Sequence, residues 1–597
     1  MAESTVTDIR GFLPAVAAPA PAKRGGPLRI LFLVSAHNGL SQRVLIALTE
    51  LGYQVAVALV DSAAAMEAAV REHDPELIVC PFLKTLIPAR IWSNHHCLVV
   101  HPGPRGDRGP SSLDWAIELR MREWGVTVVL ANGEFDAGEV LSSRTFPMRE
   151  AGKTSLYRHA VRHAAVGAML QAIGLILEGA GGRDGHRAQP APFGRARPLM
   201  TQTDRAIDWG AESTDAVMRK IRAGDGHPGV LDAIGGREFH LFGAHRERLL
   251  NGRPGELIAR RHGAICRATV DGAVWITHLK RRDTPTARYF KLPATDALEL
   301  AGVEAEVPES EIALDARLPA EHTYRELSYE EQAGVGYLRF DFYNGAMSTD
   351  QCRRLRAAFA HACARDTKVI VLLGGDDYFS NGIHLGVIEA SEEPGAESWR
   401  NLNAIDDLVR DIVQTESHLV ISALGGDAGA GGVPLALAGD YVIAREDIVL
   451  NPYYRHMGGL HGSEYWTYLL PRRIGAAWAR RLTDPPFDPV GTNEALRIGL
   501  IDAVLAPSPD DVRTQVRRFA ERVANDGLHQ ARLSTKQRRR VHDERVKPLH
   551  AYRTEELAQC LECFFGPDRS YHEARRRFIY KTAGDNTARE EPACLAI

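Results

Sequence analysis

The sequence predicts an α/β protein of several domains. Apolar runs that read as strands alternate with helix-like stretches in two separate parts of the chain, first after Leu28 and again from Val335 onward. Strands that alternate with helices are typical of parallel sheets covered by helices. The chain has 597 residues, which is more than one hydrophobic core usually organises. We therefore expect two or three domains.

The composition is that of an ordinary globular protein and excludes several classes. Hydrophobic residues make up 45% of the chain and charged residues 25%, and the net charge is −4. No overall basic field therefore favours a nucleic-acid partner. Eight cysteines scattered over the chain do not form the framework of a disulfide-rich secreted domain, so we expect a cytoplasmic protein.

Two stretches that could be taken for targeting or membrane segments are expected to be neither. Residues 1–26 are rich in Ala and Pro and have no sustained apolar core, which predicts a disordered arm rather than a signal peptide. Residues 419–444 are apolar, but they contain Asp427, Asp440 and several glycines. A membrane span is therefore not expected there.

The first folded domain is expected at residues 27–190. Leu28 to Ser35 is an apolar run that ends in a small and polar loop, and Gln42 to Leu51 has helical periodicity. Gln54 to Val60 and Leu77 to Cys80 repeat the apolar-run pattern. This succession predicts a parallel sheet, and ligands in such sheets bind beyond the carboxyl ends of the strands.

Four further segments follow along the chain. Residues 179–198 are a linker by composition, and residues 198–292 alternate apolar and polar residues with turns such as Asp271-Gly272, which predicts a small β-barrel. Residues 293–330 are expected to be a second, acidic linker. Residues 331–597 are expected to form a further α/β domain with a helical, strongly charged end.

A histidine closes a predicted strand of the first domain. It is His101 in the stretch VVHPGPRGDRGP, and a DAG turn with Asp136 follows 35 residues later. These motifs resemble the 10-formyltetrahydrofolate-dependent formyltransferases over about residues 27–285. The resemblance implies that 10-formyltetrahydrofolate is the formyl donor and that His101 and Asp136 are the catalytic pair. A histidine suits the proton transfers, and a carboxylate beside it favours the imidazolium.

The resemblance extends to binding residues and departs at one position. The loop after the third predicted strand is expected to hold the folate at Phe82 and Leu83, and Asn132 is a further expected binding residue. The family has an asparagine two residues before the histidine, where its amide helps to hold the oxyanion, whereas this chain has Val99. Asn38 or Asn132 could supply that donor from a neighbouring loop.

Three motifs in the second α/β domain resemble an acyl-CoA thioester site. They are VIVLLGGDDYFSNG at residues 369–382, GGDAGAGGVPLALAGD at residues 425–440 and NPYYRHMGGLHGSEYW at residues 451–466. Over about residues 335–530 they resemble the crotonase family of enoyl-CoA hydratases and isomerases. The resemblance therefore implies that coenzyme A binds to this domain.

Two glycine turns of this site are expected to hold the thioester oxygen. The resemblance assigns the donors to the backbone N–H groups of Ile383 and Gly431, with Gly382 and Gly432 beside the ligand, and Asp440 fixes the alignment. Glycine suits these turns because the chain must approach the ligand closely and adopt positive φ.

Hydratases of this family add water with two glutamates, and both are missing here. Pro434 stands at the first position, and Tyr454, or Tyr453 if the alignment is off by one, stands at the second. Glu464 follows ten residues after Tyr454. We therefore expect no hydratase and assign proton transfer to Tyr454 and Glu464, because a phenol donates a hydrogen bond and a buried carboxylate has a raised pKa.

Several other residues are expected to be structural. His384, His456 and His461 are interpreted in this way, and no metal site is predicted. Cys560 and Cys563 form a CxxC motif without a second pair. The basic run at residues 536–540 is more typical of a solvated helix face than of a contact to CoA phosphates.

A folate-dependent formyltransferase followed by an acyl-CoA enzyme is an unusual order of modules. It resembles the HypX (HoxX) family of hydrogenase maturation factors. The resemblance implies that the protein makes the carbon monoxide ligand of nickel-iron hydrogenase by formyl transfer to coenzyme A and decarbonylation of formyl-CoA. Small molecules are then the substrates, and hydrogenase maturation proteins or the hydrogenase large-subunit precursor are expected partners, without nucleic acid or membrane.

Three other functions stay open on the sequence alone. The chain could be a formyltransferase that acts on an amine or a sugar, a formyl-CoA thioesterase, or a non-catalytic maturation scaffold. These alternatives differ in their products, so they are separable by experiment.

Overall fold

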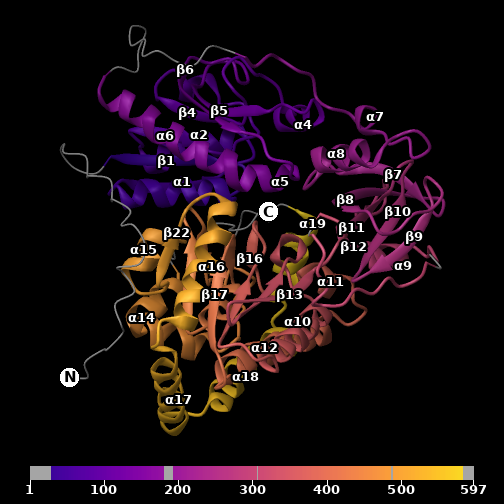
Figure 1. Cartoon of the computed structure of the whole chain (residues 1–597). Coiled ribbons are helices and arrows are strands. Elements are labelled where there is room, and N and C mark those ends of the chain that lie inside the picture. The colour runs from indigo at the N-terminus through magenta and orange to yellow at the C-terminus, as the bar shows by residue number, and fades with distance from the viewer. Residues whose placement is uncertain (1–27, 180–192, 305–306, 320, 486–488, 583–597) are drawn as a thin grey trace. The chain divides into compact units, whose positions relative to one another are not determined.

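A computed structural model describes residues 28–179, 193–304, 307–319, 321–485 and 489–582 (Figure 1). The expected disordered arm at residues 1–26 lies outside these ranges. The described chain divides into two compact units. The first holds the described residues up to Glu311 and the segment Pro319–Tyr324, and the second holds Ile312–Leu318 and the chain from Arg325.

The first unit begins with a six-stranded sheet in the order β2-β1-β3-β4-β5-β6. Its strands are β1 (Arg29–Val34), β2 (Gln54–Leu59), β3 (Leu77–Cys80), β4 (Cys97–His101), β5 (Glu123–Leu130) and β6 (Val140–Pro147). The first four are parallel as predicted, whereas β5 and β6 are antiparallel, which corrects the expectation of a wholly parallel sheet. The connection between β4 and β5 contains the helix α4 (Ser112–Glu118).

Helices cover both faces of this sheet. Ile30, Phe32 and Val34 of β1 pack with residues of α1 (Gly39–Glu50) and α6 (Arg162–Leu177), whereas Leu31 and Leu33 pack on the other face with Met66. Met66 belongs to α2 (Ala63–His73), and α3 (Ala89–Trp92) follows β3. A strand that is covered on both sides reads as a continuous apolar run, which explains the pattern in the sequence.

One stretch of the described chain is long and apolar enough to cross a membrane. It is Lys153–Leu177, which comprises α5 (Lys153–Leu156), a π-helical turn η2 (Tyr157–Val161) and α6, with a mean hydropathy of 1.5. Its α6 part packs against β5 and β6, and half of the apolar window is buried inside the protein. These contacts are those of a core helix.

The strands expected to form a barrel make an antiparallel sheet in the order β7-β8-β11-β10-β9, and β12 also pairs with β11. The strands are β7 (Val230–Ile234), β8 (Arg237–Glu247), β9 (Leu257–Arg261), β10 (Ala264–Ala268), β11 (Ala273–Arg281) and β12 (Leu292–Pro293). Two helices precede them, α7 (Gln202–Arg205) and α8 (Thr214–Gly224). The turn between β9 and β10 lies at His262 and Gly263, both with positive φ.

Residues 293–330 are more than a linker. They include α9 (Ala294–Leu300), whose Ala294, Ala297 and Leu298 are buried and which contacts β11. The first strand of the second unit, β13, starts at Leu327, so the expected boundary at residue 331 falls inside a strand. The acidic residues conceal the helix in the sequence because its apolar face is only a few residues long.

The second unit contains two sheets, in the orders β13-β14-β15-β17-β19-β22 and β16-β18-β20-β21. The larger one consists of β13 (Leu327–Gln332), β14 (Val335–Phe340), β15 (Val369–Leu373), β17 (Leu419–Leu424), β19 (Tyr441–Arg445) and β22 (Ala503–Leu505). The smaller one consists of β16 (Tyr378–Ser380), β18 (Asp427–Gly429), β20 (Val449–Asn451) and β21 (Val490–Gly491). β14 to β22 are parallel in the larger sheet, and β16, β18 and β20 are parallel in the smaller.

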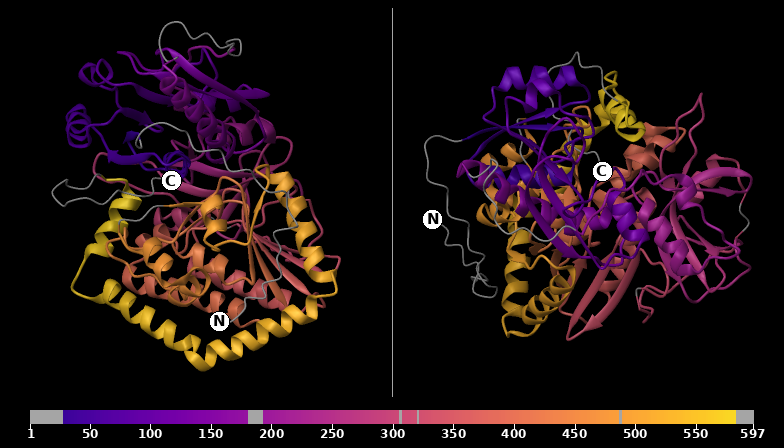
Figure 2. Two further views of the ribbon diagram at one scale, coloured as in Figure 1. Left: turned by 90° about the vertical axis from the view of Figure 1, so that its left-hand side faces the viewer. Right: turned by 90° about the horizontal axis from the view of Figure 1, so that it is seen from above.

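Helices surround both sheets, and the last four form the predicted helical end. They are a 3-10 turn η3 (Tyr343–Gly345), α10 (Thr349–Cys363), α11 (Leu385–Ala390), α12 (Pro394–Gln414), α13 (Gly432–Leu437), α14 (Trp466–Thr483), α15 (Thr492–Arg497), α16 (Pro509–Asn525), α17 (His529–Val546), α18 (Leu549–Phe565) and α19 (Ser570–Tyr580). The long helices α17 and α18 run along one side of the second unit (Figure 2).

The basic run at residues 536–540 is partly buried in this helical end. Lys536 Nζ lies 2.6 Å from Asp440 Oδ2, and Arg540 donates a 2.7 Å hydrogen bond to the Tyr468 hydroxyl. Both side chains are buried. The run therefore docks α17 onto the second unit, which corrects the expectation of a solvated helix face.

Candidate active sites

His101 lies between two carboxylates at the end of β4. Its Nε2 is 2.9 Å from Asp107 Oδ2, and its Nδ1 is 3.2 Å from Asp136 Oδ1. His101 and Asp107 are both buried, with 4% of each residue exposed. β4 ends here next to Thr127 of β5, so the sheet fixes the place of the histidine. The predicted pair of His101 and Asp136 is therefore brought together.

The two carboxylates raise the proton affinity of His101. Burial by itself lowers the pKa of the imidazole, but hydrogen bonds to Asp107 and Asp136 and their charges outweigh burial and raise the pKa to about 9. Burial acts to raise the pKa of Asp136, and the contact to His101 holds that pKa below its ordinary value. The site thus favours an imidazolium at neutral pH.

Asp107 was not predicted, and it is fixed by a residue far away in the sequence. Its Oδ1 accepts a 3.0 Å hydrogen bond from Arg197, whose backbone N–H is bonded to Arg108 O. A Cβ on Gly103 would lie 2.3 Å from Asp107 Oδ2, so the close approach depends on that glycine. The acidic residue in the RGDRG stretch could have indicated Asp107 in the sequence. Arg197 stood in an expected linker, so the sequence gave no indication of its role.

Asn132, one of the residues expected to bind folate, makes its contacts within its own loop. Asn132 donates to Ala137 O at 3.2 Å and accepts from the Glu134 N–H at 3.0 Å, so its amide holds the loop of Asp136. Asn38 caps α1 by accepting from the Ser41 N–H. Neither Asn38 nor Asn132 is among the residues that line the cavity at His101.

A cavity of about 180 Å³ opens at His101. Phe82 and Leu83 lie in the loop after β3, where Phe82 O accepts from the Ser35 N–H, and neither residue lines the cavity. The lining residues are His101, Pro104, Arg105, Gly106, Asp107, Arg108, Thr127, Val129, Asp136, Gly138 and Val140.

The second site is built on two glycine turns that meet. Gly382 has φ +75°, and a Cβ placed on it would lie 3.1 Å from the backbone nitrogen of Gly431. In the described part of the chain, the N–H groups of Ile383 and Gly431 donate to no protein acceptor. Two N–H groups left unpaired at touching turns form the donor arrangement of an oxyanion hole.

Tyr454 and Glu464 meet beside these turns. The Tyr454 hydroxyl donates a 2.9 Å hydrogen bond to Glu464 Oε2, and a Cβ on Gly431 would lie 2.3 Å from Glu464 Oε1. The carboxylate therefore lies against the turn that carries one proposed donor. Tyr453 instead packs its ring on His456 at 5.6 Å between ring centroids, so Tyr454 is the tyrosine of this site.

Burial controls the charge of this pair. Glu464 is 1% exposed, and burial followed by the nearby charge of Asp406 raises its pKa to about 8. Burial and then the charge of Glu464 raise the pKa of the Tyr454 phenol well above its usual range. The phenol therefore stays protonated, and Glu464 is the member of the pair that titrates near neutral pH.

The remaining candidates of the second unit have structural contacts. A Cβ on Gly432 would lie 1.9 Å from Ser380 O, so this glycine allows close packing at the start of α13. His384 Nδ1 accepts from the Val387 N–H and caps α11. Asp440 accepts from the Val420 N–H, and the Cys560 thiol donates to Gly462 O.

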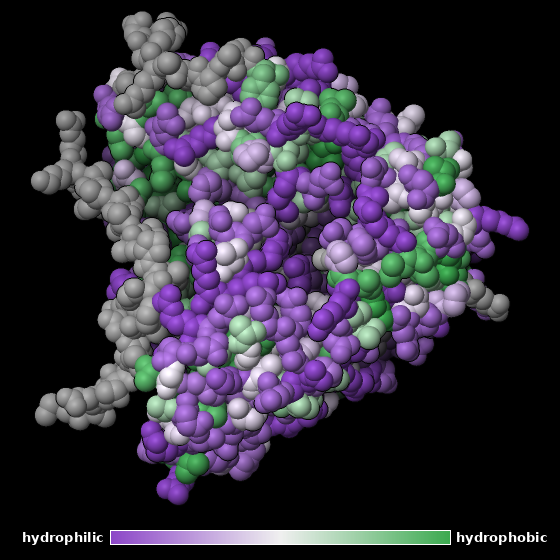
Figure 3. Space-filling model, in the orientation of Figure 1, coloured by the Kyte–Doolittle hydropathy of each residue, from purple (hydrophilic) through white to green (hydrophobic). Residues whose placement is uncertain are grey.

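A larger cavity lies away from both sites. It has a volume of about 280 Å³ and contains none of the predicted site residues. It is lined by Arg353, Arg356, Trp399, Arg400, Asn403, Ala404 and Asp407 on α10 and α12, over which the surface is mostly hydrophilic (Figure 3). Arg356 is paired there with Asp407 and Asp411, so the arginines of this cavity are largely neutralised.

The fold and the two sites define a formyltransferase-type unit joined to a crotonase-type unit. The Formyl transferase model matches residues 58–173, the Formyl transferase C-terminal domain model matches 199–290, and the Enoyl-CoA hydratase/isomerase model matches 330–573. The chain is 47% identical over 566 residues to the hydrogenase maturation factor HoxX of Bradyrhizobium diazoefficiens, covering 94% of this chain and 96% of that protein. The chain belongs to the HypX/HoxX family of hydrogenase maturation factors.

A solved structure and a more distant relative agree with this membership. The crystal structure of HypX from Aquifex aeolicus in complex with tetrahydrofolic acid is 41% identical, with a TM-score of 0.88 over 94% of this chain and 97% of that one. The methionyl-tRNA formyltransferase of Variovorax paradoxus is 29% identical over 232 residues, which cover 37% of this chain and 69% of that enzyme.

Proposed function

We propose that this hydrogenase maturation factor makes the carbon monoxide ligand of nickel-iron hydrogenase from a formyl group. The first site transfers the formyl group of 10-formyltetrahydrofolate to coenzyme A, and the second site decarbonylates formyl-CoA. The observation that carries the proposal is the Tyr454–Glu464 pair against the Gly431 turn. The folate assignment is supported by the Aquifex aeolicus HypX structure, which holds tetrahydrofolic acid.

In the first step His101 carries the thiol proton of coenzyme A to the folate. The neutral imidazole is the minor form at neutral pH, and its share grows as the pH approaches the pKa of about 9. Nε2 of this neutral form accepts the thiol proton, the sulfur forms a bond to the formyl carbon, and the proton passes to the folate N10 as the carbon–nitrogen bond breaks. A pKa of about 9 for His101 is close to about 8.5 for a thiol, so the first transfer is nearly balanced in free energy. While Nε2 binds the thiol, Asp107 still accepts a hydrogen bond from Arg197.

In the second step the formyl hydrogen leaves as a proton. The N–H groups of Ile383 and Gly431 hold the carbonyl oxygen, and the Glu464 carboxylate accepts the proton from the formyl carbon. The carbon–sulfur bond breaks, carbon monoxide is released, and the thiolate takes a proton from Tyr454, which regains one from Glu464. The products are carbon monoxide and coenzyme A, and the enzyme returns to its starting state.

The chemistry of formyl-CoA excludes the usual reactions of the crotonase fold. This thioester has no α-carbon, so no enolate can form, and hydration requires the two glutamates that Pro434 and Tyr454 replace. Hydrolysis to formate competes with decarbonylation, and it needs water at the carbonyl carbon. The complete burial of the Tyr454–Glu464 pair supports exclusion of water, which favours carbon monoxide.

The proposed setting follows from the family. We expect the protein to work in the cytoplasm with small-molecule substrates and to pass its product to hydrogenase maturation proteins or to the hydrogenase large-subunit precursor. Both partners are proposals, and we assign no docking site for either of them on the described residues.

One experiment distinguishes the proposal from its alternatives. Purified protein is incubated with 10-formyltetrahydrofolate and coenzyme A, and carbon monoxide, formate and formyl-CoA are measured. Carbon monoxide that requires both substrates supports the proposal. Formate alone indicates a thioesterase, formyl consumption only with an added amine or sugar indicates another formyltransferase, and no turnover indicates a scaffold.

A further inference from the structure

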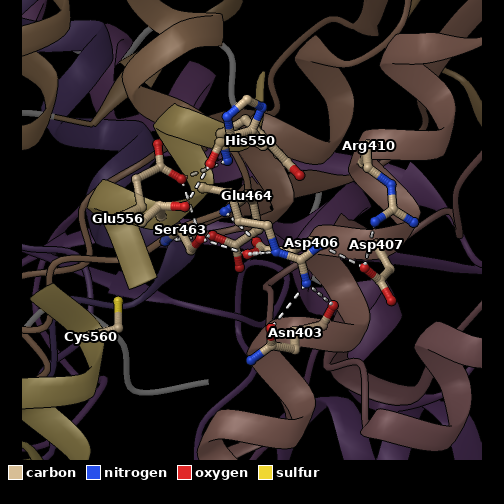
Figure 4. Close-up of polar contacts among 12 residues, drawn as sticks. Asn403, Asp406, Asp407, Arg410, Ser463, Glu464, His550, Glu556 and Cys560 are labelled. Carbon is tan, nitrogen blue, oxygen red and sulfur yellow. Dashed lines mark hydrogen bonds and ion pairs between the residues drawn. The ribbon is translucent and has the colours of Figure 1, made fainter. Parts of the chain in front are cut away.

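Two further carboxylates converge on the carboxylate of Glu464, which is paired with Tyr454. Asp406 comes from α12, Glu556 from α18 and Glu464 from the turn before α14, and the three residues are 0%, 0% and 1% exposed (Figure 4). Buried carboxylates are costly unless donors and cations compensate them. Their convergence at one turn therefore points to a role in that turn.

Asp406 and Glu556 bind the backbone of the turn itself. Glu464 and Tyr465 have φ of +61° and +59°, a left-handed conformation that is unfavourable for residues with side chains. The Glu464 N–H donates to Asp406 Oδ1 at 2.8 Å, and the Tyr465 N–H donates to Glu556 Oε2 at 2.9 Å. These two bonds hold the conformation that aims the Glu464 side chain at Tyr454.

Donors around the two supporting carboxylates oppose the effect of burial. Burial raises the pKa of Asp406 to about 6 and the pKa of Glu556 to about 8, and the donors act to lower both values. Ser463 Oγ is 2.9 Å from Asp406 Oδ2 and 3.2 Å from Glu556 Oε2, and Arg553 Nε is 3.5 Å from Asp406. Glu556 Oε1 accepts from the Thr467 N–H in the first turn of α14. The positive end of the first part of α14, whose helical conformation is interrupted at Gly475, stabilises a carboxylate at this position.

Glu464 has fewer compensating partners than its neighbours. Its Oε2 accepts from the Tyr454 hydroxyl and from the Ser463 N–H, and no cation contacts it among the described residues. The other titratable groups that face it are the buried thiols of Cys352 and Cys560, whose pKa values burial raises. Asp406 is therefore ionised at neutral pH, whereas Glu556 ionises in the same pH range as Glu464. Their negative charge acts on Glu464 without a cation beside Glu464 to offset it.

We propose that Asp406 and Glu556 are positioning residues of the second site, which hold the Glu464 turn and make its carboxylate a stronger base through their negative charge. This inference rests on the proposed function, because it deepens the assignment of Glu464 as the base. It is supported by the direction of the pKa shift: burial and then the charge of Asp406 raise the pKa of Glu464, and Glu556 adds to the rise.

The test separates charge from shape. Asp406→Asn and Glu556→Gln keep the size of each side chain and an oxygen that accepts from the backbone, but they remove the negative charge. Asp411→Asn, at a half-buried ion pair further along α12, is the matched control. The titration of Glu464 is followed by infrared difference spectroscopy of its carboxyl group. For each protein, the spectrum of the same protein with the additional substitution Glu464→Gln is subtracted.

The expected result is a lower titration midpoint for Glu464. We expect Asp406→Asn to shift it down by about one pH unit, Glu556→Gln to shift it in the same direction, and Asp411→Asn to leave it unchanged. The rise of carbon monoxide release with pH should move by the same amount, with a lower plateau because the base is weaker. Unchanged midpoints in both folded variants would overturn the proposal.

The infrared readout keeps this inference apart from the proposed function. If the wild-type protein releases no carbon monoxide, the proposed function fails, while the midpoints still decide whether the two carboxylates tune Glu464. If Asp406→Asn does not fold, Glu556→Gln decides the matter, because it lies on another helix and removes the same charge.

Discussion

The Tyr454 hydroxyl donates a 2.9 Å hydrogen bond to Glu464 Oε2, and both side chains are buried. Burial keeps the phenol protonated, whereas the pKa of Glu464, raised to about 8, allows this group to lose its proton near neutral pH. The contact therefore divides the roles, with Tyr454 as proton donor and Glu464 as base.

Replacing the base is expected to stop the second reaction alone. Glu464→Gln keeps the shape of the side chain but cannot accept the formyl proton, so carbon monoxide release should fall by about 100-fold or more. Formyl-CoA should then accumulate in a two-substrate reaction followed by chromatography. Tyr453→Phe, at the neighbouring tyrosine that packs on His456, is the control and should retain full release. Undiminished carbon monoxide from the glutamine variant would exclude Glu464 as the base.

Adding one methyl group at the glycine turn is expected to displace the same carboxylate. In Gly431→Ala the Cβ would lie 2.3 Å from Glu464 Oε1, so the side chain must move away from the proposed oxyanion donors. Carbon monoxide release should be lost, while formyl-CoA formation persists. Gly174→Ala in α6 has no atom within 4 Å of the new Cβ and serves as the matched control. Equal carbon monoxide release by both alanine variants would argue against the close approach of Glu464 to Gly431.

Removing the second carboxylate at His101 is expected to lower its proton affinity. Asp107→Asn keeps the size of the side chain but removes a charge and an acceptor, so the pKa of His101 should fall from about 9 toward its ordinary value. The pH profile of formyl-CoA formation should shift to lower pH by about one unit. Glu134→Gln, at an exposed carboxylate in the loop of Asp136, controls for a general change in charge. A profile that does not move would show that Asp107 does not tune the histidine.

The raised pKa of His101 also predicts how stability depends on pH. A histidine whose folded pKa lies above its unfolded value of about 6.5 stabilises the fold fully below that value, and the contribution is lost as pH rises through about 9. A shift of this size corresponds to roughly 3 to 4 kcal/mol for a buried group. Urea unfolding should therefore show a larger stability difference between wild type and His101→Gln at pH 6 than at pH 10. A difference independent of pH would contradict the pairing with the two carboxylates.

The sequence could reveal residues that stand in short local motifs. His101 and Asp136 mark the ends of a strand and a loop, and Tyr454 and Glu464 stand in one 16-residue stretch. Such motifs report the turn that the backbone makes. Gly382 adopts the expected positive φ, whereas Gly431 has φ −60° and meets only the expectation of close approach. The sheet order, the antiparallel β5 and β6 and the helix within the expected linker were not visible in the same way.

By itself, then, the sequence determined the family, the two kinds of unit and the four residues proposed to carry the chemistry. Only the tertiary structure decided which groups surround them, because Arg197 reaches Asp107 across 90 residues and Glu556 reaches Ser463 across 93. These contacts depend on how separate helices and loops pack, and the charge of a buried carboxylate depends on everything packed against it. Local patterns carry no record of that packing, so the proton affinities of His101 and Glu464 could be read only from the folded chain.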